Sequence, residues 1–98
     1  MSTDELIKAV IDWGREKGLD DPKAQLNKVI EEVGEIAHEV TRNRYGIDFD
    51  DSIGDALVTI IILADIVGAD PMDCLARAYY TIKSRKGHTE SGTFIKND

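Results

Sequence analysis

The segment from Ala56 to Val67 limits the possible folds of this chain more than any other. Its apolar side chains point in almost every direction around a helix: Leu57, Val58, Ile60, Ile61, Ile62, Leu63 and Val67. A helix that is apolar all round is stable only when its neighbours cover it from every side. A four-helix monomer of 98 residues can hardly provide that cover. The segment therefore predicts a central helix in a dimer or a higher oligomer.

Start and stop signals divide the chain into four helices. Asp21-Pro22 and Asp70-Pro71 each combine an N-cap residue with a proline at the first helical position. Glycines stand where the first and third helices are expected to end. Residues 1–98 are thus predicted to form one all-α domain, a four-helix bundle completed by dimerisation. Its helices are expected at residues 3–17, 22–43, 50–67 and 71–85, followed by an extended C-terminal arm at residues 87–98.

Composition excludes several classes of function. The formal net charge is −7 and the basic residues form no long run, which disfavours sequence-independent nucleic-acid binding. Cys74 is the only cysteine, so an intramolecular disulfide is impossible, as suits a reducing cytosol. The N-terminus lacks the regions of a signal peptide, and the apolar run Ala56–Ala64 is too short to span a bilayer. We therefore expect a soluble cytoplasmic protein that binds neither nucleic acid nor membranes.

Polar side chains line one edge of the apolar face of the second predicted helix, and two aspartates of the next helix face them. Acidic side chains three or four residues apart on a helix repel one another, and a divalent cation is the usual way to offset that repulsion. A buried carboxylate needs a partner, and Asp55 opens a strongly apolar run. A merely solvated helix edge is the competing interpretation. The set is Gln25, Lys28, Glu32, Glu35 and Glu39, with Asp51 and Asp55.

These residues also form a family pattern. A Glu-x-x-Glu on one helix and a Glu-x-x-Asp on the next are the signature of the MazG-like nucleoside triphosphate pyrophosphohydrolases, an all-α superfamily. The chain resembles this family from about Gln25 to Lys96, and in particular its small stand-alone members from phages and bacteria. The acidic pattern alone is moderately specific, and its combination with the tail is strong. The matching residues are Glu31, Glu32-Val-Gly-Glu35, Gly54-Asp55, Ile82–Gly87 and Gly92-Thr93-Phe94.

The resemblance implies an enzyme that hydrolyses ribo- or deoxyribonucleoside triphosphates between the α and β phosphates, giving the monophosphate and pyrophosphate. It implies Mg²⁺ as the cofactor, with Mn²⁺ as the alternative, and a homodimer or a dimer of dimers. Metal-ligand positions match Glu32, Glu35 and Asp55, of which Glu32 and Glu35 are also the catalytic pair. Phosphate-binding positions match Lys83, Arg85 and Lys86, and positions near the nucleotide match Gln25 and Lys28.

One position departs from the family pattern. Ser52 stands where the signature has its second-helix glutamate. Asp51, one residue earlier, is four residues from Asp55 and can reach the same side of the helix. We therefore expect Asp51 to be the replacement metal ligand.

Other interpretations remain for the same residues. Glu35-Ile-Ala-His38 suggests a di-iron bundle, but such sites need a second Glu-x-x-His unit, which the chain lacks. A non-catalytic helical module that binds a metal or a nucleotide and dimerises would also keep the family fold. Lys83, Arg85 and Lys86 also suit a helix C-terminus. Trp13 is expected in the core, with stacking on a nucleobase as the alternative.

Overall fold

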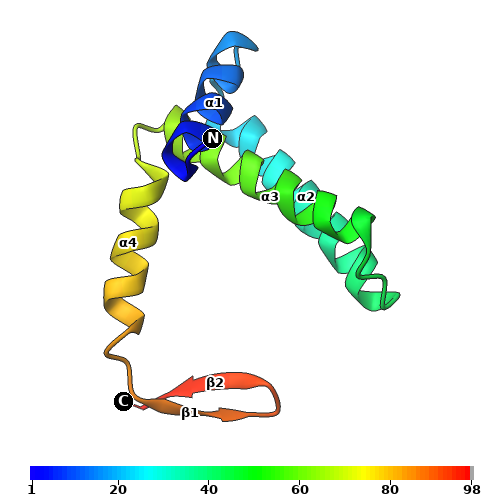
Figure 1. Cartoon of the computed structure of the whole chain (residues 1–98), viewed down its shortest axis with the longest axis vertical. Coiled ribbons are helices and arrows are strands. Elements are labelled where there is room, and N and C mark those ends of the chain that lie inside the picture. The colour runs from blue at the N-terminus through cyan, green and yellow to red at the C-terminus, as the bar shows by residue number, and fades with distance from the viewer. Residues whose placement is uncertain (98) are drawn as a thin grey trace.

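The computed structural model describes residues 1–97 (Figure 1). Its elements are α1 (Thr3–Glu16), α2 (Pro22–Thr41), α3 (Ile47–Ile66), α4 (Pro71–Ile82), β1 (Gly87–Glu90) and β2 (Thr93–Lys96). The prediction of four helices is confirmed. The predicted C-terminal arm is instead an antiparallel hairpin of β1 and β2. Asp98, the last residue of that predicted arm, lies outside the described residues.

The helix starts follow the capping chemistry of the sequence. The Asp21 carboxylate accepts a hydrogen bond from the Lys23 amide, and the Asp70 carboxylate accepts from the amides of Met72 and Asp73. Each aspartate thereby satisfies a backbone N–H that the first turn of a helix leaves free. At the start of α1, Ser2 and Glu5 form a reciprocal capping box.

Two helix boundaries differ from the prediction by three residues, and the others agree within two. Helix α3 starts at Ile47, three residues early, with Gly46 as an N-cap that offers no side-chain hydrogen bond. Helix α4 ends at Ile82, where the Arg85 amide donates to the Ile82 carbonyl and closes a turn. Lys83, Arg85 and Lys86 therefore lie at or beyond the end of α4 instead of within it.

Helix α3 is the centre of the chain. Within the described residues, the backbones of α1, α2 and α4 each come close to α3, and no two of these three backbones come close to each other. The buried apolar core is correspondingly small, with Ala56 and Ile62 as its buried side chains. The sequence predicts that neighbours cover the apolar side chains of α3 on every side. Several of these side chains lack that cover, since Leu57 is 55% exposed and Ile60 is 46% exposed. A single chain leaves much of its central helix open.

Helix α4 and the hairpin extend away from the other helices. Helices α3 and α4 meet at an angle of 105°, and the hairpin makes no packing contact with any described helix (Figure 1). The radius of gyration is 15.8 Å, compared with about 13 Å for a compact domain of this length. The accessible surface is 7498 Å², compared with about 5,600 Å² for a compact monomer of this mass. The chain thus exposes about 1,900 Å² more than a compact monomer would.

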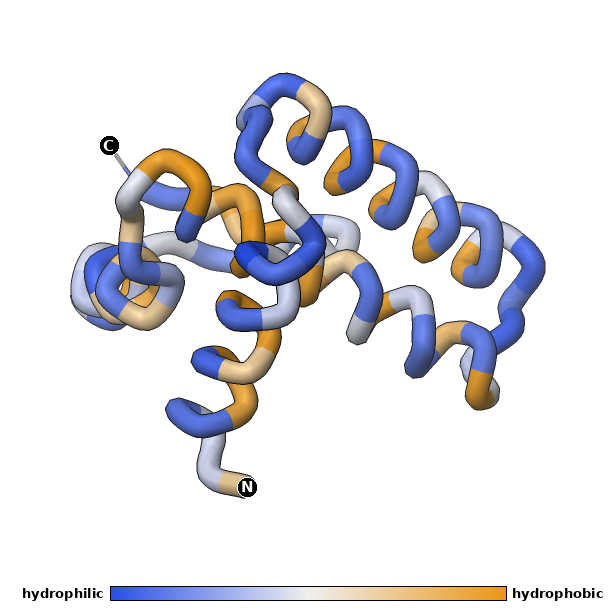
Figure 2. The backbone as a smooth tube through the Cα atoms, turned by 90° about the horizontal axis from the view of Figure 1, so that it is seen from above, coloured by the Kyte–Doolittle hydropathy of each residue, from blue (hydrophilic) through white to orange (hydrophobic). Residues whose placement is uncertain are grey.

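Apolar residues recur along every helix (Figure 2). On α2 they form a stripe at one-turn spacing, with Leu26, Ile30 and Val33 all about half exposed or more. No single described helix is long and apolar enough to cross a membrane. Helices α3 and α4 pass that test as a bent pair, by length and composition alone.

Candidate active site

A cavity of about 300 Å³ lies between α1, α2 and α3. Helix α1 contributes an indole ring, α2 contributes an amide, an ammonium and a carboxylate, and α3 contributes a second carboxylate. One side of the cavity is therefore apolar and the other carries charge. The lining residues are Trp13, Leu19, Gln25, Lys28, Glu32, Asp55, Val58, Thr59 and Ile62.

Gln25 fixes the floor of this cavity. Its side chain is buried, and its Nε2 atom donates a hydrogen bond of 3.1 Å to the Thr59 carbonyl oxygen on α3. The Thr59 hydroxyl donates to the Ala56 carbonyl oxygen at 2.8 Å. A buried amide with a partner of this kind holds two helices in register, because losing the hydrogen bond would leave polar atoms unsatisfied. Gln25 therefore orients α2 and α3 in addition to lining the cavity.

Glu32 and Asp55 are brought to the same cavity from two helices. Glu32 lies two turns after Gln25 on α2, and Asp55 lies one turn before Thr59 on α3. The hydrogen bond between Gln25 and Thr59 thus sets the pairing that places both carboxylates on one side. The expected burial of Asp55 is wrong for the single chain, because its side chain is exposed although it lines the cavity.

Lys28 lies at the edge of the cavity. Its ammonium nitrogen is 3.1 Å from a carboxylate oxygen of Glu31, and both side chains are more than half exposed. An exposed pair of this kind is weak and screened by salt. The Lys28 ammonium is therefore available to an anion that enters the cavity.

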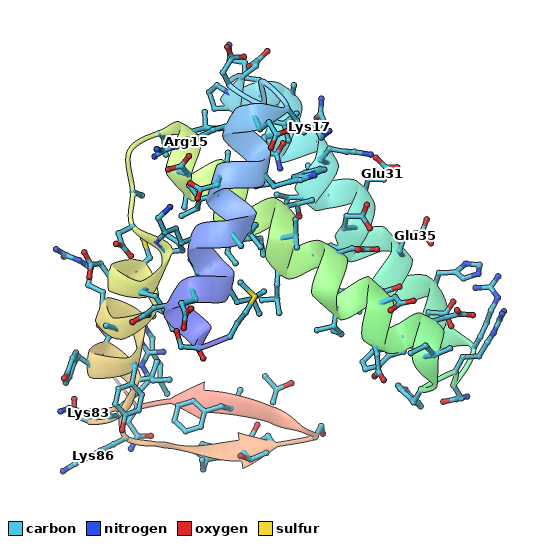
Figure 3. The ribbon with its side chains drawn as sticks, turned by 45° about the horizontal axis from the view of Figure 1, so that its top comes forward. Arg15, Lys17, Glu31, Glu35, Lys83 and Lys86 are labelled. Atoms are coloured by element: carbon cyan, nitrogen blue, oxygen red, sulfur yellow. The ribbon has the colours of Figure 1, made fainter. Side chains whose placement is uncertain are left out.

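The apolar wall of the cavity is held in place by an ion pair. Arg15 on α1 donates two hydrogen bonds, of 2.9 and 2.7 Å, to the two carboxylate oxygens of Asp65 on α3 (Arg15 is labelled in Figure 3). These hydrogen bonds, together with the nearby guanidinium charge, hold the pKa of the Asp65 carboxyl below its usual value. Close by, Gly14 contacts Ile62 so closely that a Cβ atom would lie 3.1 Å from its Cγ1. Together these contacts position Trp13.

Glu35 and Asp51 do not line this cavity, and both side chains are exposed. The Ser52 hydroxyl, at the position of the missing family glutamate, donates to the Asp48 carbonyl oxygen at 2.9 Å. It is therefore occupied within its own helix. The single chain thus brings one predicted carboxylate from each helix to the cavity and leaves the other two outside it.

The predicted phosphate-binding residues lie far from this cavity in the chain as described. In Figure 3, Glu31 and Glu35 lie on α2 at one side of the molecule, whereas Lys83 and Lys86 lie beyond α4 at the other. The Lys83 ammonium is 4.4 Å from the centroid of the Tyr80 ring, a cation–π contact. No described contact joins the basic residues of this region to α2.

The carboxylates of the cavity can bind a metal ion in one of the two usual ways. Among residues 1–97, no three acidic, imidazole or thiol groups lie close enough together to enclose a metal. Mg²⁺ does not require such a cage, because it usually binds one or two carboxylates and completes its shell with water and substrate phosphates. Glu32 and Asp55, which share the cavity, fit that mode of binding.

Sequence reasoning missed part of the cavity. Leu19, Val58, Thr59 and Ile62 line the cavity but have no chemical signature of their own. Trp13 was expected in the core, yet it is 50% exposed and forms part of the cavity wall. Glu39 is only 8% exposed, and its Oε2 atom is buried without a hydrogen-bond partner. Its place beside the apolar face of α2 was visible in the sequence, and that place favours the burial that the structure shows.

Comparison with known proteins gives one distant relative. The chain is 36% identical over 63 residues to an uncharacterised 18.2 kDa protein of the rep–hol intergenic region of Haemophilus phage HP1. The match covers 61% of this chain and 38% of the phage protein. No protein-family model matches the chain, and no solved structure matches it.

Proposed function

We propose that this protein hydrolyses nucleoside triphosphates between the α and β phosphates, giving a nucleoside monophosphate and pyrophosphate, with Mg²⁺ or Mn²⁺ as cofactor. What supports the proposal is the cavity that combines Glu32 and Asp55 with the Trp13 ring. Hard carboxylate oxygens suit a magnesium-bound polyphosphate, and an aromatic face suits a nucleobase. The family resemblance of the sequence points to the same chemistry.

In this proposal Glu32 and Asp55 hold the metal from opposite helices. A cation held there by these two carboxylates would offset their repulsion of the phosphates and would supply Lewis-acid polarisation of a phosphoryl oxygen. Gln25 keeps α2 and α3 in register, so the two carboxylates stay on one side of the cavity. Lys28 contacts a phosphate oxygen from the cavity edge, and Trp13 stacks on the base.

The reaction needs a water and a base. A water oxygen attacks the α phosphorus. The bond from this phosphorus to the bridging α–β oxygen breaks, and that oxygen leaves as part of pyrophosphate. A carboxylate within hydrogen-bond reach accepts the proton of the water. Glu32 and Glu35 are the candidates for this role, with Asp51 as a further ligand. Because Glu35 and Asp51 lie outside the cavity of the single chain, we assign their participation to the assembled oligomer.

The test is product analysis with ribo- and deoxyribonucleoside triphosphates, with and without Mg²⁺. We expect monophosphate and pyrophosphate, formed only with the metal. Glu32→Gln should lower kcat by about a hundredfold or more, since it removes a charged ligand, whereas Glu16→Gln, an exposed change at the end of α1, should not. Release of diphosphate and phosphate would contradict the proposal, because a different bond would be cut.

A non-catalytic module that binds a metal or nucleotide is the second candidate. The observation that favours it is Ser52, which puts a neutral hydroxyl, hydrogen-bonded to the Asp48 carbonyl oxygen, where the family pattern has a carboxylate. Titration calorimetry with a non-hydrolysable triphosphate separates the two candidates. Binding without turnover of any substrate would favour the module, and turnover abolished by Glu32→Gln with binding retained would exclude it.

A further inference from the structure

The segment from Pro71 to Lys96, called here the α4–hairpin segment, is unsupported in the single chain. Helix α4 has 12 residues, none of them buried. Among the described elements its backbone comes close to α3 alone, while its first turn, at Pro71 and Met72, borders α1. All eight strand residues are exposed. A short isolated helix and a lone two-stranded hairpin are both marginal in water. Their stability therefore requires a surface that this chain does not provide for itself.

The uncovered side chains of the segment are those that a partner would bury. Leu75, Tyr79 and Ile82 recur at helical spacing on α4, and each is more than half exposed. On the hairpin, Phe94 is also exposed, with its ring folded diagonally across Gly87. The segment thus carries an apolar stripe from α4 into the hairpin without a covering element.

Charge indicates where the segment docks. The α4–hairpin segment carries five Lys or Arg and two Asp or Glu, a net charge of +3. Residues 1–70 carry seven Lys or Arg and sixteen Asp or Glu, a net charge of −9. Opposite charges of this size steer the segment toward the acidic helices. The α2–α3 pair carries both the acidic residues Glu32 and Asp55 and the exposed apolar residues Leu26, Ile30 and Leu57, on different sides of its helices.

The segment does not reach that surface on its own chain. It leaves α3 at 105° and makes no packing contact with α2. The opening between α4 and the α2–α3 pair is visible in Figure 1. The excess surface of about 1,900 Å² per chain, or about 3,800 Å² for two chains, matches the 2,000–5,000 Å² of obligate dimer interfaces.

We propose that the α4–hairpin segment of each chain docks on the α2–α3 pair of a second copy, in a reciprocal exchange. Lys83, Arg85 and Lys86 then reach the carboxylates of the other copy. Each site combines Glu32 and Asp55 from one chain with the basic residues of its partner chain. This exchange deepens the proposed function and rests on it for the role of the basic residues, whereas the docking itself does not depend on catalysis.

A photo-crosslinker tests the docking without any assay of activity. The probe is p-benzoylphenylalanine in place of Phe94, with the same probe in place of Lys17 as the control. Lys17 caps the far end of α1. On irradiation at micromolar concentration, the Phe94 probe should give a covalent dimer, with the cross-linked peptide from α2 or α3, and the Lys17 probe should not. Cross-links confined to one chain, or a dimer joined hairpin to hairpin, would overturn the proposal.

Mixed dimers test the shared site. One chain carries Glu32→Gln, and the other carries Lys83→Ala, Arg85→Ala and Lys86→Ala. After the two inactive proteins are unfolded and refolded together, half of the dimers are mixed, and each has one intact site. Activity should return to about one quarter of the wild-type value. An equally mixed sample without activity, beside an active wild type, would overturn the exchange and leave the proposed function standing. An inactive wild type would overturn the proposed function, and the cross-link would still decide the docking.

Discussion

At the scale of single residues, Glu39 is the most unusual side chain in the structure. Its Oε2 atom is buried and has no hydrogen-bond partner among the described residues. A buried carboxylate oxygen in that state costs free energy of folding, because it has lost its water and gained nothing in return.

Glu39→Gln should therefore stabilise the protein, since it removes the charge and keeps the shape. We expect the free energy of unfolding to rise by about 1 kcal/mol, measured by urea denaturation at pH 7. Glu35→Gln, one turn earlier on α2 and exposed, is the matched control and should change little. A loss of stability in Glu39→Gln would mean that this carboxylate has a partner in the assembled protein.

The ion pair of Arg15 and Asp65 should make stability depend on pH in the acid range. Because the pKa of Asp65 is lowered in the folded state, the pair stabilises the fold above the unfolded value of 3.8. That contribution is lost as the pH falls through the lower folded value. Asp65→Asn should lower Tm by a few degrees at pH 7, and the difference from wild type should disappear below the folded pKa of Asp65.

Thermal unfolding followed by circular dichroism between pH 7 and pH 2 would show this convergence. Asp12→Asn is the control, because Asp12 pairs with Lys8 on the exposed face of α1, the helix that carries Arg15. A difference that stays constant down to pH 2 would assign the loss to packing instead of charge.

At the scale of elements, the sequence was most informative where capping chemistry is local. Asp21-Pro22 and Asp70-Pro71 located the starts of α2 and α4, since a carboxylate that caps the first turn needs no tertiary contact. The hairpin was missed, although Ser91-Gly92 is a two-residue turn with φ values of 49° and 80°. Such positive values define the tight turns that suit hairpins. The four-residue strands were too short to show a clear alternation.

Gly87 controls the geometry of the hairpin. A Cβ atom at this position would lie 2.6 Å from the Phe94 ring and would overlap the Ile95 carbonyl oxygen. Gly87→Ala should therefore open the pairing of Gly87 with Lys96 and leave the helices intact. Cross-strand NOEs between β1 and β2 would report this loss, with unchanged helical circular dichroism. Thr89→Ala, on the same strand, should keep the NOEs, and retention of them in Gly87→Ala would contradict this account.

In the candidate site, too, residues placed by local helical periodicity could be predicted, and residues placed by distant contacts could not. Gln25, Lys28, Glu32 and Asp55 share one cavity, because helical periodicity places them on facing edges of α2 and α3. Trp13 could not be placed from the sequence, since its position depends on the contact between Arg15 and Asp65, fifty residues apart. Asp55 was expected to be buried, but an apolar sequence run says only that cover is needed and not where the cover comes from.

At the scale of the whole molecule, the exposed apolar part of α3 is the feature that most lowers the stability of a single chain. Leu57 borders an apolar groove of about 370 Å³ with Leu6, Val10, Ile61 and Met72. Exposed apolar surfaces of this kind mark places where another molecule binds, and the proposed occupant is a second copy of the chain.

Leu57→Glu should therefore prevent assembly, because it introduces an unpaired charge into the interface. Light scattering coupled to size-exclusion chromatography should give at least twice the mass of one chain for the wild type. The variant should give the mass of one chain, folded or unfolded. Lys23→Glu, an exposed charge change on α2, should keep the wild-type mass. A wild type that stays monomeric at tens of micromolar would contradict the oligomer.

With the proposed dimer as the working unit, activity would depend steeply on the concentration of the chain. When two copies are needed for each working unit, the number of working units rises with the square of the chain concentration while most chains are single. At a low concentration of the protein a cell would thus gain almost no activity, and a rapid rise in synthesis would raise the activity steeply. The exposed leucine and isoleucine side chains of one helix would then set the protein concentration above which activity appears.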